Sequence, residues 1–337
     1  MIKTRFGGQG MDILNLNKIE VLLKLINIRR NKNMSNIINC KAIRDKYIEE
    51  IKAKDLTGCT VAFVQVGENQ ASNVYVRNKK KLCEEVGIEV EHYKLSENTT
   101  EEQLLATIDM LNKCSAITGV MVQLPLPKHI DENKVINAID PNKDIDGFHV
   151  VNKGKVVIGD DGGTIAATPK GIMTILKEEG IDLKGKNVVV VGRSNIVGKP
   201  LVSLLINEGA TVTCCNSNTD LNRLLIHIST CDIFISAIGK ANYWNLNIFE
   251  EILNERKLLL KYCPDEYGDT FFTGICPVAI DIGINRDEDN KLCGDIDKEL
   301  YPYFKKVTSV PGGVGLTTQM AVVSNIVELF ERNKYDI

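Results

Sequence analysis

The chain has 337 residues, of which 44% are hydrophobic and 25% charged, a composition typical of globular proteins. Its length is about twice that of an ordinary domain, so we expect two domains. The formal net charge of −3 is not the basic excess that nucleic-acid binding favours, and no apolar run approaches the roughly 18 residues of a membrane span. We therefore expect a soluble protein that binds neither nucleic acid nor membranes.

Ten cysteines are scattered along apolar segments, and only Cys214 and Cys215 lie close together in sequence. Adjacent cysteines do not have the spacing of a zinc site and the chain has only four histidines, so we expect no metal. Reduced thiols in a cytosol-like compartment are the favoured interpretation, because disulfides are rare where glutathione keeps thiols reduced.

The first 33 residues differ from the rest, with seven Lys or Arg against two acidic residues, Asp12 and Glu20. Four apolar residues of this extension stand at helical spacing: Ile19, Leu22, Leu23 and Ile26. The pattern is compatible with a mitochondrial transit peptide, whereas the shortage of serine and the two acids argue against one. We favour the alternatives, a disordered extension or a true start at Met34, and a cytoplasmic location.

The first half of the chain predicts alternating strands and helices. Strands are expected at residues 60–66, 89–95 and 119–124, where apolar residues concentrate between turn residues. Helices are expected around residues 43–51, at 72–86, and after Thr100, which has capping-box spacing with Gln103. Strands this apolar, joined by helices, favour a parallel sheet that is covered on both faces.

A second α/β run begins at residue 186. We expect strands at residues 188–191, 210–214, 232–238 and 278–282, and helices at residues 200–208 and about 317–330. Residues 240–276 fit the alternation poorly, and we interpret them as an insertion. The whole pattern therefore indicates two α/β lobes.

A glycine loop follows the first strand of the second run. Gly192 ends the strand and Gly198 opens the next helix, an arrangement that presents backbone N–H groups and a positive dipole end to a pyrophosphate. Ser194 occupies the position of the middle glycine of a dinucleotide fingerprint, so the match is incomplete. A tight turn without a ligand would have a similar sequence.

The expected cofactor is NADP. The segment 214–218 after the next strand has no acidic residue to hold a ribose 2′-hydroxyl, while Arg193 follows the first glycine. We therefore expect Arg193 and Ser217 to hold a 2′-phosphate. The prediction is tested by the NADP-to-NAD ratio of kcat/KM after Arg193→Ala.

Candidate catalytic groups lie in the first half. Tyr75 and Lys79 are four residues apart and share one face of the predicted helix. Short-chain dehydrogenases use the same spacing, but there the glycine loop precedes the pair, which argues against that class. Gln123 and the pair Asp144 and Asp146 follow predicted strands, where ligands bind open α/β sheets. Each could instead cap a strand or form a turn.

Taken together, these segments closely resemble the bifunctional methylenetetrahydrofolate dehydrogenase/cyclohydrolase family. The matching segments occur in the family's order, at residues 66–81, 122–127, 143–148, 168–171, 192–198, 281–285 and 311–315. The resemblance covers the chain from about residue 35 to residue 330.

The resemblance implies a folate-binding lobe at residues 34–170 plus 311–337, with the last helix returning to it, and a Rossmann-type NADP-binding lobe at 171–310. It implies a homodimer that oxidises 5,10-methylenetetrahydrofolate with NADP and hydrolyses the methenyl product to 10-formyltetrahydrofolate. The alternatives that we retain are a dehydrogenase-only relative and a catalytically silent NADP- or folate-binding regulator.

The resemblance also implies a role for single residues. Lys79 matches the catalytic lysine that carries a proton while water attacks the methenyl carbon, and Gln123 the glutamine that holds it. Tyr75 matches the aromatic residue that stacks on the folate, and Asp146 the carboxylate that accepts from the pterin. The residues expected at the cofactor are Gly192, Arg193, Ser194, Gly198, Ser217 and Ile284.

Four positions depart from the usual family pattern. Leu316 stands where proline is usual, and Ala167 replaces a common cysteine before Thr168. Asn216 and Asn218 flank Ser217 where a histidine and a basic residue often stand. The last departure weakens the support for NADP over NAD.

Overall fold

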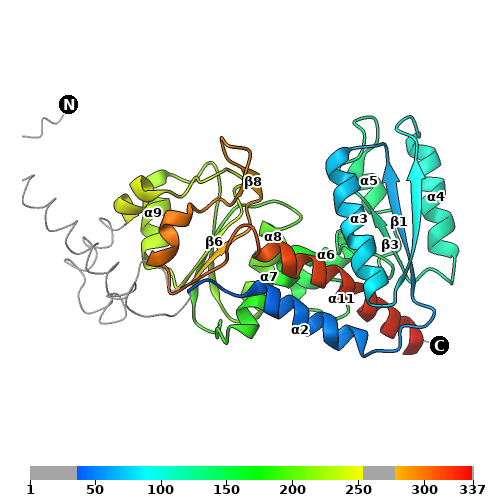
Figure 1. The fold of residues 1–337 in the computed structure, drawn as a ribbon, viewed down its shortest axis with the longest axis horizontal. Helices are drawn as coiled ribbons and strands as arrows, with labels where there is room; N and C mark the ends of the chain where they lie inside the picture. The colour runs from blue at the N-terminus through cyan, green and yellow to red at the C-terminus, as the bar shows by residue number, and fades with distance from the viewer. Residues whose placement is uncertain (1–35, 253–277, 336–337) are drawn as a thin grey trace, which may run out of the picture.

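The computed structural model describes residues 36–252 and 278–335, which form two α/β lobes joined by a set of long helices (Figure 1). The predicted extension at residues 1–33 and most of the predicted insertion, from residue 253 to 276, lie outside the described residues. Within the described ranges, no helix is both long and apolar enough to cross a membrane. The eight cysteines of these ranges are all free.

The first lobe is built on a parallel three-stranded sheet of order β2-β1-β3. Its strands are β1 (Thr60–Val66), β2 (Glu89–Leu95) and β3 (Gly119–Val122). The helices around it are α3 (Gln70–Glu85), α4 (Glu101–Lys113) and α5 (Glu132–Ile136). Apolar residues of β1 alternate between two cores, one under α4 and one under α3. The predicted capping box is confirmed, because Thr100 and Gln103 bond each other's backbone N–H at the start of α4.

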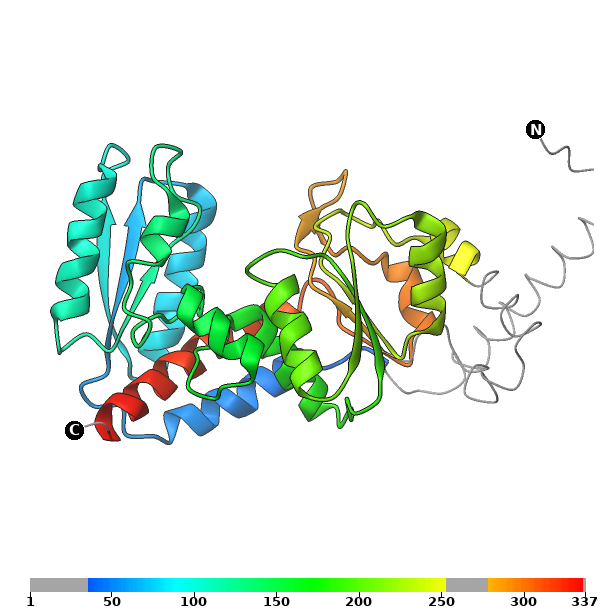
Figure 2. The same cartoon turned by 180° about the vertical axis from the view of Figure 1, so that it is seen from behind.

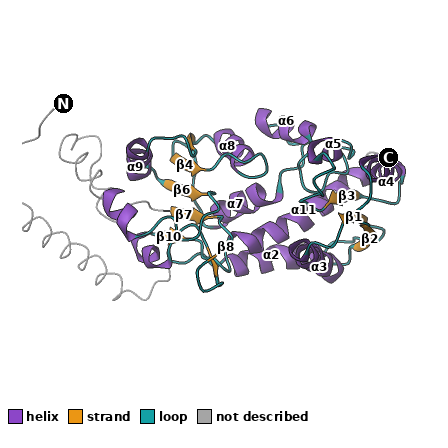
Figure 3. Ribbon diagram, turned by 90° about the horizontal axis from the view of Figure 1, so that it is seen from above, coloured by secondary structure: helices purple, strands orange, loops and turns teal. Residues whose placement is uncertain are grey.

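The second lobe contains a parallel five-stranded sheet of order β10-β7-β6-β4-β5 (Figure 3). Its strands are β4 (Asn187–Val191), β5 (Thr211–Cys215), β6 (Ile233–Ser236), β7 (Val278–Asp281) and β10 (Lys306–Val307). Helices α8 (Gly198–Asn207) and α9 (Leu221–Thr230) cover opposite faces. A small hairpin of β8 (Asn285–Arg286) and β9 (Leu292–Cys293) follows β7, and a 3-10 helix (Lys298–Tyr303) precedes β10. The doubly wound Rossmann-type arrangement is confirmed.

Three helices contribute side chains to the cores of both lobes. They are α2 (Cys40–Lys52), α7 (Ala167–Glu178) and α11 (Val314–Tyr335). In α11, Val314 packs in the core of the second lobe, while Met320 and the turns after it pack in the first. The last helix thus returns to the first lobe, as expected. A shorter helix, α6 (Val150–Ile158), packs against α8 on the other side of the molecule (Figure 2).

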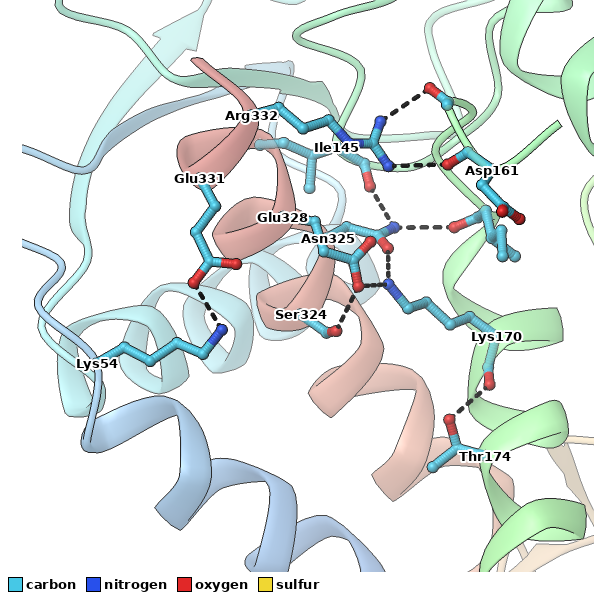
Figure 4. A network of polar contacts seen from close by, with 12 residues as sticks. Lys54, Ile145, Asp161, Lys170, Thr174, Ser324, Asn325, Glu328, Glu331 and Arg332 are labelled. Carbon is cyan, nitrogen blue, oxygen red and sulfur yellow. Dashed lines mark hydrogen bonds and ion pairs between the residues drawn. The ribbon is translucent and has the colours of Figure 1, made fainter. Parts of the chain in front are cut away.

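A polar network fastens α7 and the first lobe to α11 (Figure 4). Lys170 of α7 is an ion-pair partner of Glu328 and donates to Asn325 Oδ1 at 2.8 Å. Asn325 in turn donates to the carbonyl oxygens of Ile145 and Ile165, at 2.8 and 2.9 Å. Burial lowers the pKa of Lys170, and the neighbouring Glu328 opposes that shift. The network fixes the end of the segment that carries Asp146.

Packing adds two details to the expected lobes. Residues 36–38, assigned to the first lobe, pair in parallel with β10 of the second, with Ile38 N donating to Val307 O at 2.8 Å. The beginning of the predicted insertion belongs to the core of the second lobe, because Trp244, Phe249 and Ile252 are buried there. The sequence pattern did not predict their burial, because this stretch departs from the regular alternation of strands and helices.

Candidate active site

A cavity of about 210 Å³ lies between the lobes, and we call it the interlobe cavity. Tyr75, Lys79, Gln123 and Asp146, the four residues expected at the folate, all line it. The second lobe contributes Ile196 and Val197 of the glycine loop, α7 contributes Ala167 and Thr168, and α11 contributes Thr318 and Val322. The structure therefore brings the predicted substrate residues and the glycine loop to one cavity.

Lys79 is positioned by α3 and by the strand beside it. Its Nζ lies 3.5 Å from Asp146 Oδ1 and donates to Met121 Sδ at 3.0 Å. The Lys79 and Asp146 side chains are only 19% and 14% exposed, so their attraction is less screened than that of a surface pair. Tyr75 stands one turn earlier on α3 and is about half exposed, leaving its ring available for stacking.

Gln123 follows β3. It was expected to hold Lys79 by a hydrogen bond, but its amide bonds elsewhere. Its Nε2 donates to the Leu124 carbonyl at 2.6 Å. Its Oε1 is buried and has no hydrogen-bond partner within the described part of the chain. Because an unpaired buried acceptor costs roughly 1–3 kcal/mol, this oxygen is suited to a donor that arrives with a ligand.

Asp144 and Asp146 have different surroundings although they belong to one turn. Asp144 is buried and accepts from the backbone N–H groups of Gly147 and His149, at 3.0 and 2.8 Å, and from Asn152 Nδ2 at 3.0 Å. Its three partners fix the turn. Asp146 faces the interlobe cavity, so of the two candidates only Asp146 is placed to bind a ligand.

The glycine loop is shaped by close backbone approaches. Gly192 has a φ of 133°, and a Cβ there would overlap the Ala237 carbonyl. A Cβ on Gly198 would overlap the Gly192 carbonyl. Ser194 Oγ accepts from the backbone N–H groups of Val197 and Gly198, at 3.2 and 3.4 Å. The serine in place of the middle glycine therefore binds the backbone N–H groups of the N-cap residue and of the first residue of α8.

The other residues expected at the cofactor lie along the carboxyl edge of the sheet. Arg193 follows β4, Ser217 follows β5 and Ile284 follows β7, and all three are exposed. In the described ranges Arg193 has no carboxylate partner, and it is close enough to Cys214 to act on the pKa of that thiol, which burial raises. A free guanidinium beside the second strand fits a phosphate-bearing ribose.

Met121 is a residue that sequence analysis missed. It occupies an apolar strand position and is almost fully buried, so its periodicity predicts only a core residue. Thr318 and Val322 of α11 are also missed, because nearly 200 residues separate them from Gln123 in the chain. No local pattern identifies such long-range neighbours.

The two-lobe fold has a cavity lined by ionisable side chains beside a Rossmann-type glycine loop. This arrangement assigns the chain to the two-domain dehydrogenases. The family model described as tetrahydrofolate dehydrogenase/cyclohydrolase, catalytic domain, matches residues 36–146. Its companion, the NAD(P)-binding domain, matches residues 166–253 and 275–334. The chain belongs to the tetrahydrofolate dehydrogenase/cyclohydrolase family, and the resemblance inferred from the sequence is confirmed.

Relatives match over nearly the whole described chain. The bifunctional protein FolD of Agathobacter rectalis is 45% identical over 308 residues, which cover 89% of this chain and 100% of that protein. The crystal structure of the bifunctional FolD enzyme from Campylobacter jejuni is 36% identical and covers 88% of this chain and 98% of its own, with a TM-score of 0.76. A Trypanosoma brucei FolD structure complexed with NADP cofactor and inhibitor is 28% identical, covers 90% and 98%, and has a TM-score of 0.73.

Proposed function

We infer that the chain is a bifunctional enzyme of one-carbon metabolism, which oxidises 5,10-methylenetetrahydrofolate to the methenyl compound and hydrolyses that to 10-formyltetrahydrofolate. The observation that carries this inference is the interlobe cavity, in which Lys79, Asp146 and Gln123 face the glycine loop. The dehydrogenase-only and silent-regulator alternatives lose support, because every expected catalytic side chain lines the cavity.

The residues of the second lobe fit NADP. Arg193 and Ser217 stand at the sheet edge where the adenosine ribose binds in this fold, and the loop from Gly192 to Gly198 would hold the pyrophosphate. When bound, the nicotinamide accepts the hydride. The chain positions the folate carbon against it, and hydride loss needs no protein base because the folate nitrogen lone pair stabilises the cation.

Asp146 is proposed to bind the pterin by accepting from its amino and ring N–H groups. In the free enzyme the same carboxylate lies 3.5 Å from Lys79 Nζ, so a pterin that engages Asp146 is held beside that amine. The buried Gln123 Oε1 then has a nearby donor in the substrate or in the attacking water.

Hydrolysis follows from the same arrangement. Water attacks the methenyl carbon and Lys79 Nζ takes one of its protons, which gives a neutral carbinolamine. That proton passes to the ring nitrogen as the C–N bond breaks, and the remaining hydroxyl proton is released to solvent as the formyl C=O forms. Tyr75 packs its ring against the folate and keeps the carbon in reach of Lys79.

We also propose a homodimer in the cytoplasm. The family resemblance supports the dimer, and β5 presents an unpaired edge of the five-stranded sheet in the described chain. Light scattering during size-exclusion chromatography tests the dimer, and a mass near that of one chain, 37.4 kDa, would contradict it.

One assay tests the proposed activity. Purified protein is mixed with 5,10-methylenetetrahydrofolate and either NADP or NAD, and formation of the reduced cofactor is followed together with the methenyl absorbance. Separately, methenyltetrahydrofolate is supplied without cofactor and its loss is followed. We expect NADP-dependent turnover and cofactor-independent hydrolysis, and the absence of both would favour a silent binding protein.

A further inference from the structure

A buried carboxylate outside the interlobe cavity holds two loops of the second lobe. Asp295 is fully buried, and its Oδ2 accepts from Ser236 Oγ and from Ile238 N, both at 2.8 Å. Its Oδ1 accepts from Lys240 N at 2.9 Å and from Asn285 Nδ2 at 3.0 Å. One side chain therefore joins the loop after β6 to the hairpin after β7.

A second buried carboxylate supports the first from behind. Asp281, the last residue of β7, accepts from Gly283 N and Asp295 N at 3.0 Å and from Ile296 N at 2.9 Å. Both surrounding glycines are required, because a Cβ on Gly283 would overlap the Asp295 carboxylate and a Cβ on Gly294 the Asp281 carboxylate. The pair is saturated with neutral donors.

The loops that Asp295 holds lie where the cofactor binds in this fold. They follow β6 and β7 at the carboxyl edge of the parallel sheet, beside the glycine loop that follows β4. Gly192 approaches the Ala237 carbonyl so closely that a Cβ would not fit between them. Ile284 lies between Gly283 and Asn285, and its side chain is exposed. Displacement of either loop would thus change the surface offered to the cofactor.

We propose that Asp295 is a positioning residue for the dinucleotide, which sets the spacing of the loops after β6 and β7 without touching the ligand. The proposal rests on the inferred NADP-dependent function. Asp295 meets four donors, and a carboxylate can accept from all of them. An amide of the same shape has only one acceptor atom, so Asp295→Asn turns an NH₂ group toward two donors.

Hydrolysis of methenyltetrahydrofolate requires no dinucleotide, so this activity is an internal control for effects on cofactor binding. Asp295→Asn is expected to raise the KM and the calorimetric Kd for NADP about tenfold or more, with cofactor-free hydrolysis kept within about twofold of wild type. Asp297→Asn is the matched control, because the Asp297 side chain accepts only from Glu299 N among the described contacts, at 3.0 Å, at the start of the 3-10 helix. This variant should change neither measurement.

Three outcomes would overturn the proposal: an unchanged Kd for NADP in Asp295→Asn, a parallel loss of hydrolysis, or the same Kd change in Asp297→Asn. If Asp295→Asn does not fold, Asn285→Ala takes its place, since it removes one of the four partners at a partly buried position. It should raise the Kd for NADP by a few fold with normal hydrolysis, and an unchanged Kd would refute the proposal. A wild-type chain that binds NADP without turnover would contradict the inferred activity alone.

Discussion

The interlobe cavity and the Asp281–Asp295 pair differ in how completely their buried polar atoms are hydrogen-bonded. In the cavity, Lys79 has a carboxylate at 3.5 Å and a thioether as partners, while Gln123 Oε1 has no partner among the described residues. The buried pair meets a donor at every oxygen. Hydrogen-bonding capacity is therefore left open in the cavity, where a ligand must bind. It is used completely in the buried pair, which holds the loops after β6 and β7 in place.

The comparison predicts that substitutions in the cavity reduce activity with little change in stability. Lys79→Met should show the largest effect, lowering kcat for hydrolysis by roughly 10²–10⁴-fold because the proton carrier is lost. NADPH formation should fall much less, since hydride transfer needs no protein base. Lys80→Met is the matched control, because Lys80 is paired with Glu84 on the surface of α3. Full hydrolysis by Lys79→Met would remove Lys79 from the mechanism.

The turn that carries Asp144 and Asp146 contains one residue of each kind: Asp146 faces the cavity, and Asp144 is buried with its hydrogen bonds made. Asp146→Asn should raise the KM for folate by roughly 10–100-fold, because a charge-assisted acceptor for the pterin is lost. Its melting temperature should stay close to wild type. Asp144→Asn should do the reverse and lower the melting temperature, because its three donors would meet an amide. Normal folate kinetics for Asp146→Asn would assign Asp146 to the turn alone.

Cofactor choice is expected to respond to Arg193, the exposed charge on the glycine loop. Arg193→Ala should lower the NADP-to-NAD ratio of kcat/KM by about tenfold, because one charge-assisted contact to the 2′-phosphate is removed. Arg223→Ala on the exposed side of α9 provides the control. A ratio unchanged in Arg193→Ala would show that another group reads the phosphate.

Protonation of the buried pair should appear in the pH dependence of the free energy of unfolding. Burial raises the pKa of Asp281 to about 7, against the opposing influence of backbone hydrogen bonds from Ile296 and Asp295. The folded state therefore holds a proton that the unfolded chain releases near pH 4, so the free energy of unfolding falls as pH rises from about 4 to 7. We expect a loss of about 2 kcal/mol between pH 5 and pH 7, measured by denaturant unfolding. Asp281→Asn should flatten this slope, and an equal slope in both proteins would contradict the assignment.

The sequence predicted most of the strands because their signals are local. Residues 60–66 and 89–95 form strands with the expected bounds, since each is an apolar or alternating run between turn residues. Helix α6 was not expected, because it is short, rich in valine and contains Gly154, residues of low helix propensity. The pairing of residues 36–38 with β10 could not be predicted either, since the partners are about 270 residues apart.

The candidate site was predicted as a set of residues and not as a set of contacts. The family motifs identify Lys79, Gln123 and Asp146, and the structure brings them to one cavity. Their contacts depend on tertiary packing, which places Met121 beside Lys79 and turns the Gln123 amide toward Leu124. Asp295 gives no catalytic signal in sequence, because an acid after glycine is also typical of a turn.

The three helices shared between the cores also limit how this enzyme can be recombined. A chimera that exchanges the second lobe with that of a relative at residues 171 and 310 would cut through α7 and separate α2 and α11 from their apolar partners in the second lobe. The exchanged unit would have to include the matching faces of all three helices. In this architecture the lobes are distinct in topology, yet the same three helices carry parts of both cores.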